Sequence, residues 1–127
     1  MHLRALGLTL AWLALAPVAG AATFTRNVEI SFYCNEGRDC RICCGRWAPH
    51  NRTASGVRPR RWRTAACNWL PFGARVYLPG FGWRVVEDRM SARYGRRLDV
   101  FVGHDPGAHR RARRLGLRKL TVTVVTP

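Results

Sequence analysis

The chain has 127 residues, which allows one domain with one modest core and leaves little room for a second module. It carries 22 Lys and Arg residues against 7 Asp and Glu residues, a formal net charge of +15. Such an excess predicts accumulation on polyanions. An ordinary solvated surface, rich in Arg through compositional bias alone, explains the same charge equally well.

An apolar run over Ala5–Val18 follows a basic start and ends at Ala19-Gly20-Ala21. This pattern is typical of a secretory signal peptide with an A-x-A cleavage site. We therefore predict a signal peptide over residues 1–21 and a single domain over residues 22–127. The run is short for a membrane span, so no transmembrane anchor is expected after cleavage. Because export removes the chain from the cytosol, we expect an anionic envelope polymer as partner and no nucleic acid.

Five cysteines fall in the predicted exported domain: Cys34, Cys40, Cys43, Cys44 and Cys67. Small exported domains use disulfides to compensate for thin cores, and we expect bridges drawn mainly from Cys34, Cys40, Cys43 and Cys44. The odd count leaves one thiol over. The Cys40-x2-Cys43-Cys44 spacing also suits a soft metal, but adjacent cysteines rarely both ligate one ion. No metal and no cofactor are therefore expected.

Apolar and polar residues alternate from Val28 to Phe32 with the period of a half-buried strand. Residues 46–63 combine Pro, Gly and many Arg, which predicts an irregular surface loop. Further along, two apolar runs flank Pro79-Gly80-Phe81-Gly82, and this composition predicts a β-turn between strands. The expected strands cover residues 28–32, 64–69, 75–78, 83–86, 98–101 and 120–125.

One short helix is predicted near the C-terminus. Asp105 is placed to cap its first turn, Pro106 to occupy its first position, and Gly116 to end it. Three apolar residues fall on one face of this helix, namely Ala108, Ala112 and Leu115. About six short strands and one short helix suit a small closed barrel, which has few exposed sheet edges.

Four motifs occur in order between residues 70 and 101: L-P-F-G-x-R-V, P-G-F-G, V-x-D and R-L-D-V-F. Thr53-Ala54-Ser55-Gly56 lies upstream, and an H-x2-A-x3-G pattern begins at His109 downstream. Together these motifs resemble the 3D domain over roughly residues 28–125. That domain is found in small exported bacterial proteins and in MltA-type lytic transglycosylases. The resemblance implies a mainly β fold, a six-stranded double-psi β-barrel with one short helix, in a secreted, periplasmic or cell-wall-associated bacterial protein.

The resemblance also implies a function. In the MltA-type enzymes the aspartate of the L-D-V-F-like strand is the acid/base residue, and this role falls on Asp99. Asp88 of the V-x-D motif becomes the supporting acid. The implied activity is cleavage of glycosidic bonds in peptidoglycan glycan strands, by a monomer that binds peptidoglycan or another anionic cell-wall polymer. The alternatives are a non-catalytic wall-binding barrel stabilised by disulfides and, less well supported, a secreted cationic effector.

The residues around Asp99 allow opposite predictions of its pKa. Its apolar neighbours on either side would desolvate the carboxyl group and raise the pKa, which suits an acid that protonates a glycosidic oxygen. Arg96 or Arg97 would instead hold the group ionised and lower the pKa. In a third interpretation, Asp88 and Asp99 only accept hydrogen bonds from backbone N–H groups and hold loops in place.

The chain departs from the family pattern at two places. Asn68 lies in the region of the family's first aspartate, and an amide cannot ionise. The family's D-T-G-G loop is replaced by Asp88-Arg89-Met90-Ser91, which lacks the glycines that let a substrate come close. Both departures favour the binding-only alternative.

Four residues are candidates for contact with a substrate: Thr53, Ser55, Asn68 and Trp62. Small side chains such as those of Thr53 and Ser55 let backbone approach a ligand, and a tryptophan can stack on a sugar ring. Among the tryptophans we expect Trp69 and Trp83 in the barrel core. Trp62, between two arginines, is expected at the surface.

We predict disulfides in the exported protein, each stabilising it by about 2–3 kcal/mol at most because the loops closed are short. Mass spectrometry of the non-reduced protein, with and without thiol alkylation, counts the free thiols. Five alkylated cysteines, or a bound metal ion, would refute this prediction.

Overall fold

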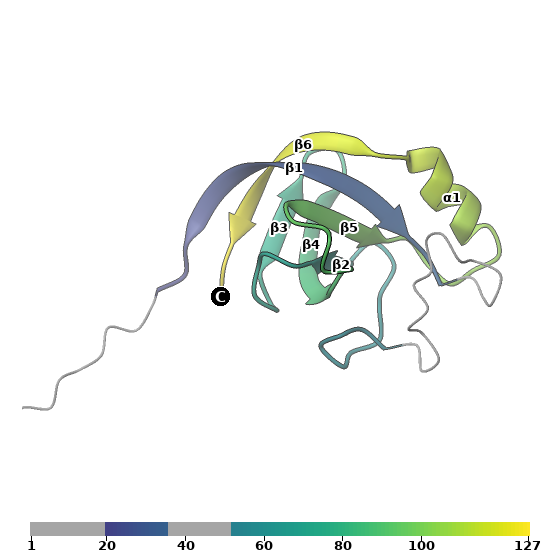
Figure 1. Cartoon of the computed structure of the whole chain (residues 1–127), viewed down its shortest axis with the longest axis horizontal. Helices are drawn as coiled ribbons and strands as arrows, with labels where there is room; N and C mark the ends of the chain where they lie inside the picture. The colour runs from purple at the N-terminus through teal and green to yellow at the C-terminus, as the bar shows by residue number, and fades with distance from the viewer. Residues whose placement is uncertain (1–19, 36–51) are drawn as a thin grey trace, which may run out of the picture.

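A computed structural model describes residues 20–35 and 52–127 (Figure 1). In this part of the chain the strands close into one barrel in the order β1-β5-β2-β4-β3-β6. The strands are β1 (Thr23–Tyr33), β2 (Thr64–Cys67), β3 (Arg75–Leu78), β4 (Gly82–Asp88), β5 (Arg97–Phe101) and β6 (Arg118–Val125), and the helix is α1 (Ala108–Leu115). The prediction of a mainly β, six-stranded barrel with one short helix is confirmed.

The barrel mixes parallel and antiparallel pairs. β1 pairs with β5, and β2 with β4, in parallel, while the remaining neighbours are antiparallel. Figure 1 shows β1 and β6 as long strands curving together over the barrel. β1 begins at Thr23, earlier than the alternation from Val28 predicted, because its first half pairs with β6 from Thr23 opposite Val125. β2 ends at Cys67, two residues before the predicted end.

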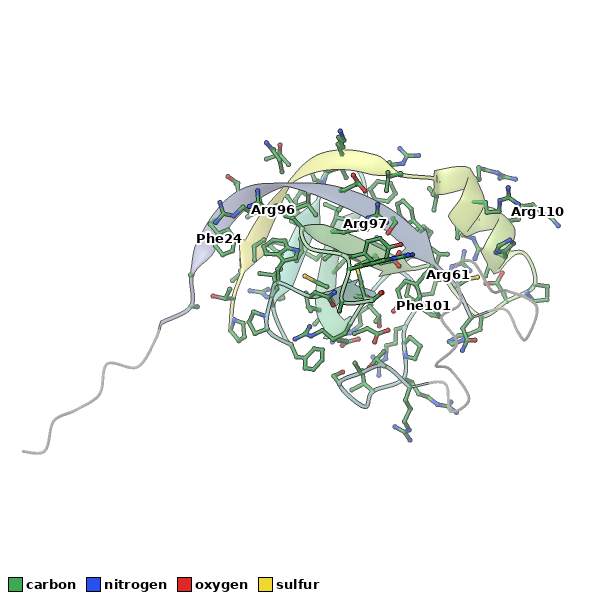
Figure 2. All side chains as sticks on the ribbon, in the orientation of Figure 1. Phe24, Arg61, Arg96, Arg97, Phe101 and Arg110 are labelled. Carbon is green, nitrogen blue, oxygen red and sulfur yellow. The ribbon has the colours of Figure 1, made fainter. Side chains whose placement is uncertain are left out.

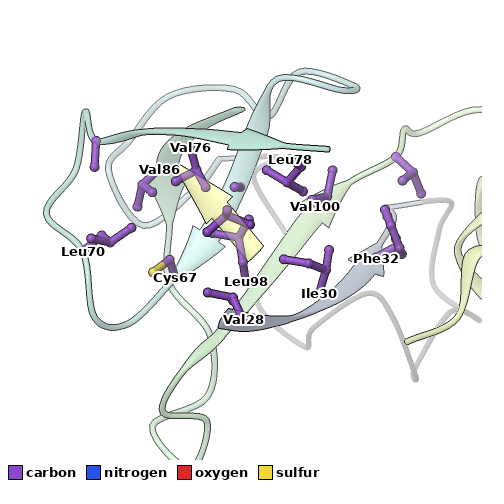
Figure 3. Close-up of a cluster of buried hydrophobic side chains, with 14 of the residues drawn as sticks. Val28, Ile30, Phe32, Cys67, Leu70, Val76, Leu78, Val86, Leu98 and Val100 are labelled. Atoms are coloured by element: carbon purple, nitrogen blue, oxygen red, sulfur yellow. The ribbon is translucent and has the colours of Figure 1, made fainter. Parts of the chain in front are cut away.

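Alternation along the strands separates an apolar interior from an outer face (Figure 3). Val28, Ile30 and Phe32 point inward from β1, and Leu98 and Val100 do so from β5. The largest fully buried core side chains are those of Ile30, Leu78, Leu98, Val76, Val86, Val100, Val102, Val122 and Val124. Since every second residue of a strand faces the other way, the polar residues between these positions lie outside the core.

The β3–β4 connection forms the predicted turn. The backbone N–H of Phe81 donates to the carbonyl oxygen of Leu78 at 2.9 Å. Gly80 has φ 82°, a left-handed conformation that glycine adopts without a steric penalty, and Pro79 precedes it. This arrangement is that of a type II turn.

Helix α1 ends as predicted but begins differently. Gly116 follows its last residue with φ 64°. At the start, Gly107 is the N-cap and no side chain caps the helix, so the predicted cap by Asp105 is wrong. The Asp105 carboxylate instead accepts hydrogen bonds from Arg111, the shortest at 2.9 Å, and lies 3.9 Å from Arg61. These guanidinium groups compete successfully for a carboxylate that would otherwise cap the helix.

The inner face of α1 is the one predicted. Ala108 and Ala112 are buried, and Leu115 packs against the core. Arg110 projects from α1 on the side away from the barrel (Figure 2). The helix therefore closes one end of the barrel with small apolar side chains and leaves basic ones in solvent.

The prediction that Trp83 lies in the core is wrong. Trp83 is 48% exposed on the outer face of β4, where it contacts Tyr77 across the hairpin. The inward position beside it belongs to Arg84, which is 5% exposed and lies against the ring of Trp62. β4 carries large apolar residues on both faces, so its sequence did not reveal which face was inside. Trp69, expected in the core, and Trp62, expected at the surface, are both partly buried and pack against the core.

Several predictions concern residues that lie outside the described ranges. Most of the predicted signal peptide, together with Cys40, Cys43 and Cys44, is in this category. Cys34 and Cys67 are described, and both are buried. They are not bonded to each other, so the disulfide prediction stays a prediction. Within residues 20–35 and 52–127, no helix has the length and apolar character needed to cross a membrane.

Replacing Leu98 by alanine should lower the free energy of unfolding by about 2–5 kcal/mol, because it removes a fully buried side chain from a packed interior. The control is Leu117→Ala, a residue 55% exposed, which should change stability by no more than about 0.5 kcal/mol. Chemical denaturation of both variants measures the difference. Equal effects would contradict the assignment of Leu98 to the core.

Candidate functional site

A row of four paired residues crosses the outer face of the barrel. Ser31 of β1 pairs with Asp99 of β5, Asp99 pairs with Ala66 of β2, and Ala66 pairs with Asp88 of β4. Directly paired residues share one face of a sheet. With strands about 4.8 Å apart, the backbones at Asp88 and Asp99 are separated by roughly 10 Å. Only the methyl group of Ala66 stands between them in the row, so both carboxyl groups border the same space.

An irregularity in β4 brings Asp88 into this row. Between Ala65 and Ala66 the pairing register shifts, so that Ala65 faces Val86 while Ala66 faces Asp88. One extra residue, Glu87, is thereby accommodated in β4, as in a β-bulge. Without the shift, Asp88 would follow the inward alternation of Val86. The bulge explains how two consecutive acids can both lie outside the apolar core.

Asp99 is the chemically unusual member of the row. Burial raises the pKa of its carboxyl group to about 7, against the opposing effects of the Ser31 hydrogen bond and the Arg97 charge. The nearby charge of Asp88 adds to the increase. Ser31 Oγ donates to Asp99 Oδ1 at 3.0 Å. Of the two opposite predictions for this pKa, the structure supports the increase through desolvation.

Arg97 acts on Asp99 but does not decide its pKa. The charge of Arg97 lowers the pKa of Asp99, and burial raises it by more. The Arg97 guanidinium group itself donates to the carboxylate of Glu29, the residue paired with it on β1, and lies over the ring of Tyr94 at 4.5 Å.

Asp88 holds the neighbouring loop against the barrel. Its Oδ1 accepts hydrogen bonds from the backbone N–H of Ala54 at 2.9 Å and of Arg89 at 2.8 Å. Its Oδ2 accepts one from the hydroxyl of Tyr33 at 3.0 Å. Three donors on one carboxylate favour a positioning role, which agrees in part with the interpretation of these acids as loop acceptors.

Sequence reasoning missed Tyr33 and Ser31. Both lie on the outward side of β1, in alternation with inward Ile30 and Phe32, and this alternation was the available signal. Burial and the charge of Asp88 raise the pKa of the Tyr33 phenol well above its ordinary value. Tyr33 therefore remains a neutral donor to Asp88 at physiological pH.

Thr53 and Ser55 adjoin the acid row through the loop that Asp88 holds. Ser55 is exposed, and its backbone N–H donates to the carbonyl oxygen of Glu87 at 3.2 Å. Thr53 is buried, and its hydroxyl bonds the carbonyl oxygen of Val57 and the hydroxyl of Ser55, each at 3.0 Å. Of the two, Ser55 is the one placed to meet a ligand.

Asn68 is fully occupied within the protein. Its amide nitrogen donates to the carbonyl oxygens of Ser91 and Tyr94, and its Oδ1 accepts from the backbone N–H of Met90 at 2.9 Å. The side chain thus fixes the loop after β4. Trp62 is partly buried against the core beside the Arg84 guanidinium group, and its backbone N–H donates to the carbonyl oxygen of Phe101 at 3.0 Å.

Metal chemistry has no support in the described ranges, where no group of three or more His, Cys, Asp and Glu side chains is arranged to hold an ion. Comparison with protein-family models finds no match for the chain, and comparison with curated protein sequences finds none either. The chemistry of the site therefore has to be argued from its own geometry.

The raised pKa of Asp99 predicts a pH dependence of stability. A free aspartate has a pKa of about 3.9, so between about pH 4 and pH 7 the folded protein binds more protons here than the unfolded chain. The Asp99 carboxyl group therefore lowers the free energy of unfolding as pH rises through that range. Asp99→Asn removes the effect, so the variant should gain stability relative to the wild type as pH rises from about 4 to about 7, by at most about 4 kcal/mol.

Asp105→Asn is the matched control with the opposite sign. The hydrogen bond from Arg111 holds the pKa of Asp105 below its ordinary value. The Asp105 carboxylate therefore contributes to stability at neutral pH, and this contribution is lost as pH falls. Denaturant unfolding at several pH values measures both differences. An Asp99→Asn difference that does not change with pH would show that the Asp99 carboxyl is not perturbed.

Proposed function

We propose that this protein is an exported peptidoglycan-acting protein that cleaves glycosidic bonds with Asp99 as the acid/base residue. The observation that carries the proposal is a carboxyl group with a pKa of about 7, bordering a second aspartate across Ala66. A general acid works best when its pKa lies near the operating pH. The resemblance to the 3D domain assigns the same role to the same residue.

The reaction needs one group that first gives a proton and then takes one. Protonated Asp99 would donate to the glycosidic oxygen as the bond from that oxygen to the anomeric carbon breaks. The resulting carboxylate would then accept the proton of the sugar's own 6-hydroxyl as that oxygen bonds to the anomeric carbon. The products are two shorter glycan strands, one of which ends in a 1,6-anhydro sugar, and no water is consumed. One carboxyl group therefore suffices.

The other residues of the row support Asp99 without needing to react. The Ser31 hydroxyl orients the Asp99 carboxyl group through its hydrogen bond. The charge of Asp88 favours the protonated form of Asp99, and three donors hold Asp88 in place. Ser55, exposed on the loop anchored by Asp88, is the residue we place against the substrate.

A non-catalytic wall-binding barrel is the second candidate, and two observations favour it. Asn68 lies where the resemblance to the 3D domain expects an aspartate, and its amide group is hydrogen-bonded to the loop after β4. Asp88 has its hydrogen-bonding capacity taken up by the protein. In this version the wall polymer binds the same exposed face but is not cut, and disulfides of the Cys34–Cys44 segment stabilise the domain.

Digestion of purified sacculi separates the two candidates. We expect anhydromuropeptides from the wild type and a loss of at least about a hundredfold in rate for Asp99→Asn, the usual contribution of a general acid. The rate should fall about tenfold per pH unit above pH 7 as Asp99 loses its proton. Asp105→Asn, the same chemical change outside the row, should cleave like the wild type.

The other outcomes are equally informative. Reducing ends in place of anhydro ends would mean hydrolysis. Intact glycan after sedimentation with bound protein would establish the binding-only candidate. Full activity of Asp99→Asn would remove the acid/base assignment.

A further inference from the structure

Three arginines and one glutamate surround a hollow of about 220 Å³ beside the acid row. Its lining consists of Val57, Arg58, Arg60, Arg63 and Glu87. The three arginines are exposed, so their guanidinium groups are open to a ligand from solvent. We propose that this hollow, here called the arginine hollow, is a binding site for a phosphoryl group.

Among the residues that the structure describes, the charge of the arginine hollow is not balanced. Arg63 lies 3.4 Å from Glu87, but in the described part of the chain neither Arg58 nor Arg60 has an ion-pair partner. One carboxylate thus faces three guanidinium groups, and two positive charges remain. A phosphate monoester carries a charge of about −1.5 to −2 at neutral pH and matches this excess.

The hollow is built before any ligand arrives. The hydroxyl of Thr64 donates to Glu87 Oε2 at 2.8 Å and accepts from the backbone N–H of Arg60 at 2.8 Å. The carbonyl oxygen of Arg60 in turn accepts from the backbone N–H groups of Arg63 and Thr64, at 3.1 and 3.0 Å. This tight turn fixes the chain from which two of the arginines project. Binding therefore needs ordering of side chains only, which keeps its entropic cost low.

The lining favours phosphate over other anions. Guanidinium groups match phosphate oxygens through paired N–H donors, and three of them can surround a tetrahedral group, whereas a carboxylate offers two oxygens in one plane. None of the described residues that line the hollow is aromatic, so this lining offers no stacking surface of the kind typical of sites for single-stranded nucleic acid. The matching ligand is thus a phosphate group on a non-aromatic carrier, or free phosphate.

The location suggests how such a ligand would be used. Glu87 of the hollow directly precedes Asp88 of the acid row, and its carbonyl oxygen accepts the backbone N–H of exposed Ser55. A phosphate held in the hollow would keep the adjoining sugar of a polymer close to the acid row. This last step rests on the proposed function, whereas phosphate binding itself does not.

Calorimetric titration of the purified protein with inorganic phosphate tests the site. We expect binding by the wild type and about tenfold weaker binding by Arg58→Gln/Arg60→Gln, because two charged donors are lost. The matched control is Arg113→Gln/Arg114→Gln on α1, which lowers the net charge equally at exposed positions and should bind within about twofold of the wild type. Glu87→Gln should bind phosphate about threefold more tightly, because it removes the negative charge from the lining of the hollow. The amide oxygen of the variant can still accept the hydrogen bond from the Thr64 hydroxyl.

Three results would overturn the proposal. They are no phosphate binding by the wild type, an equal loss of phosphate affinity in the two double variants, and acetate binding as tight as phosphate binding. Titration with sacculi before and after removal of their phosphate groups then identifies the source of the ligand. Equal retention of both preparations would assign the hollow to free phosphate; weaker retention of the stripped sacculi would assign it to a wall polymer.

The two proposals fail separately in these experiments. Phosphate binding by a protein that leaves sacculi intact would uphold the arginine hollow and refute the enzymatic function. Cleavage of sacculi by a protein that does not bind phosphate would uphold the enzymatic function and refute the arginine hollow. Asp99→Asn, which should abolish cleavage, should bind phosphate as the wild type does.

Discussion

Closure of the barrel is the constraint on which the site depends. A closed six-stranded sheet has an interior that side chains must fill, so Leu98 and Val100 of β5 point inward. Asp99 between them is forced to the outer face. There it meets Ser31 on one side and Ala66 on the other, in the fixed register of its two neighbours. The acid is thus placed by the packing of the residues around it.

An outward position would normally leave a carboxyl group in water, with an ordinary pKa. Here the group is desolvated in spite of its outward position, and burial is the largest cause of its raised pKa. The rings of Tyr33 and Phe101, paired neighbours on β1 and β5, are tilted with their centroids 5.2 Å apart, and Asp88 ties the loop at Ala54 to the end of β4. The bulge that turns Asp88 outward supplies a second charge near Asp99.

Much of this arrangement could be predicted from the sequence, because the relevant signals are local. Alternation, the Pro79–Gly80 turn and the glycine after α1 depend on residues close together in the chain, and the structure contains all three. The failures arose where side-chain contacts and strand pairing in the folded barrel decide. The early start of β1 depends on its pairing with distant β6, the start of α1 on Arg111 competing for Asp105, and the outward face of Trp83 on the burial of its neighbour Arg84.

The candidate site follows the same division. Asp99 and Asp88 were found from motifs, but the direction of the pKa shift at Asp99 could not be predicted, since burial raises that pKa and the Arg97 charge lowers it. Burial is the larger effect, and it depends on packing that exists only in the folded barrel. Tyr33 was missed because a tyrosine at the end of a strand has many ordinary explanations.

The large positive charge of the chain makes the raised pKa of Asp99 informative. A field of this sign stabilises carboxylates and by itself lowers their pKa values. The Arg97 charge does lower the pKa of Asp99, but desolvation by burial is the larger effect and the pKa is raised to about 7. The fold therefore combines a large positive charge with one carboxyl group whose pKa lies near neutral pH. The proposed cleavage of an anionic polymer would use both properties.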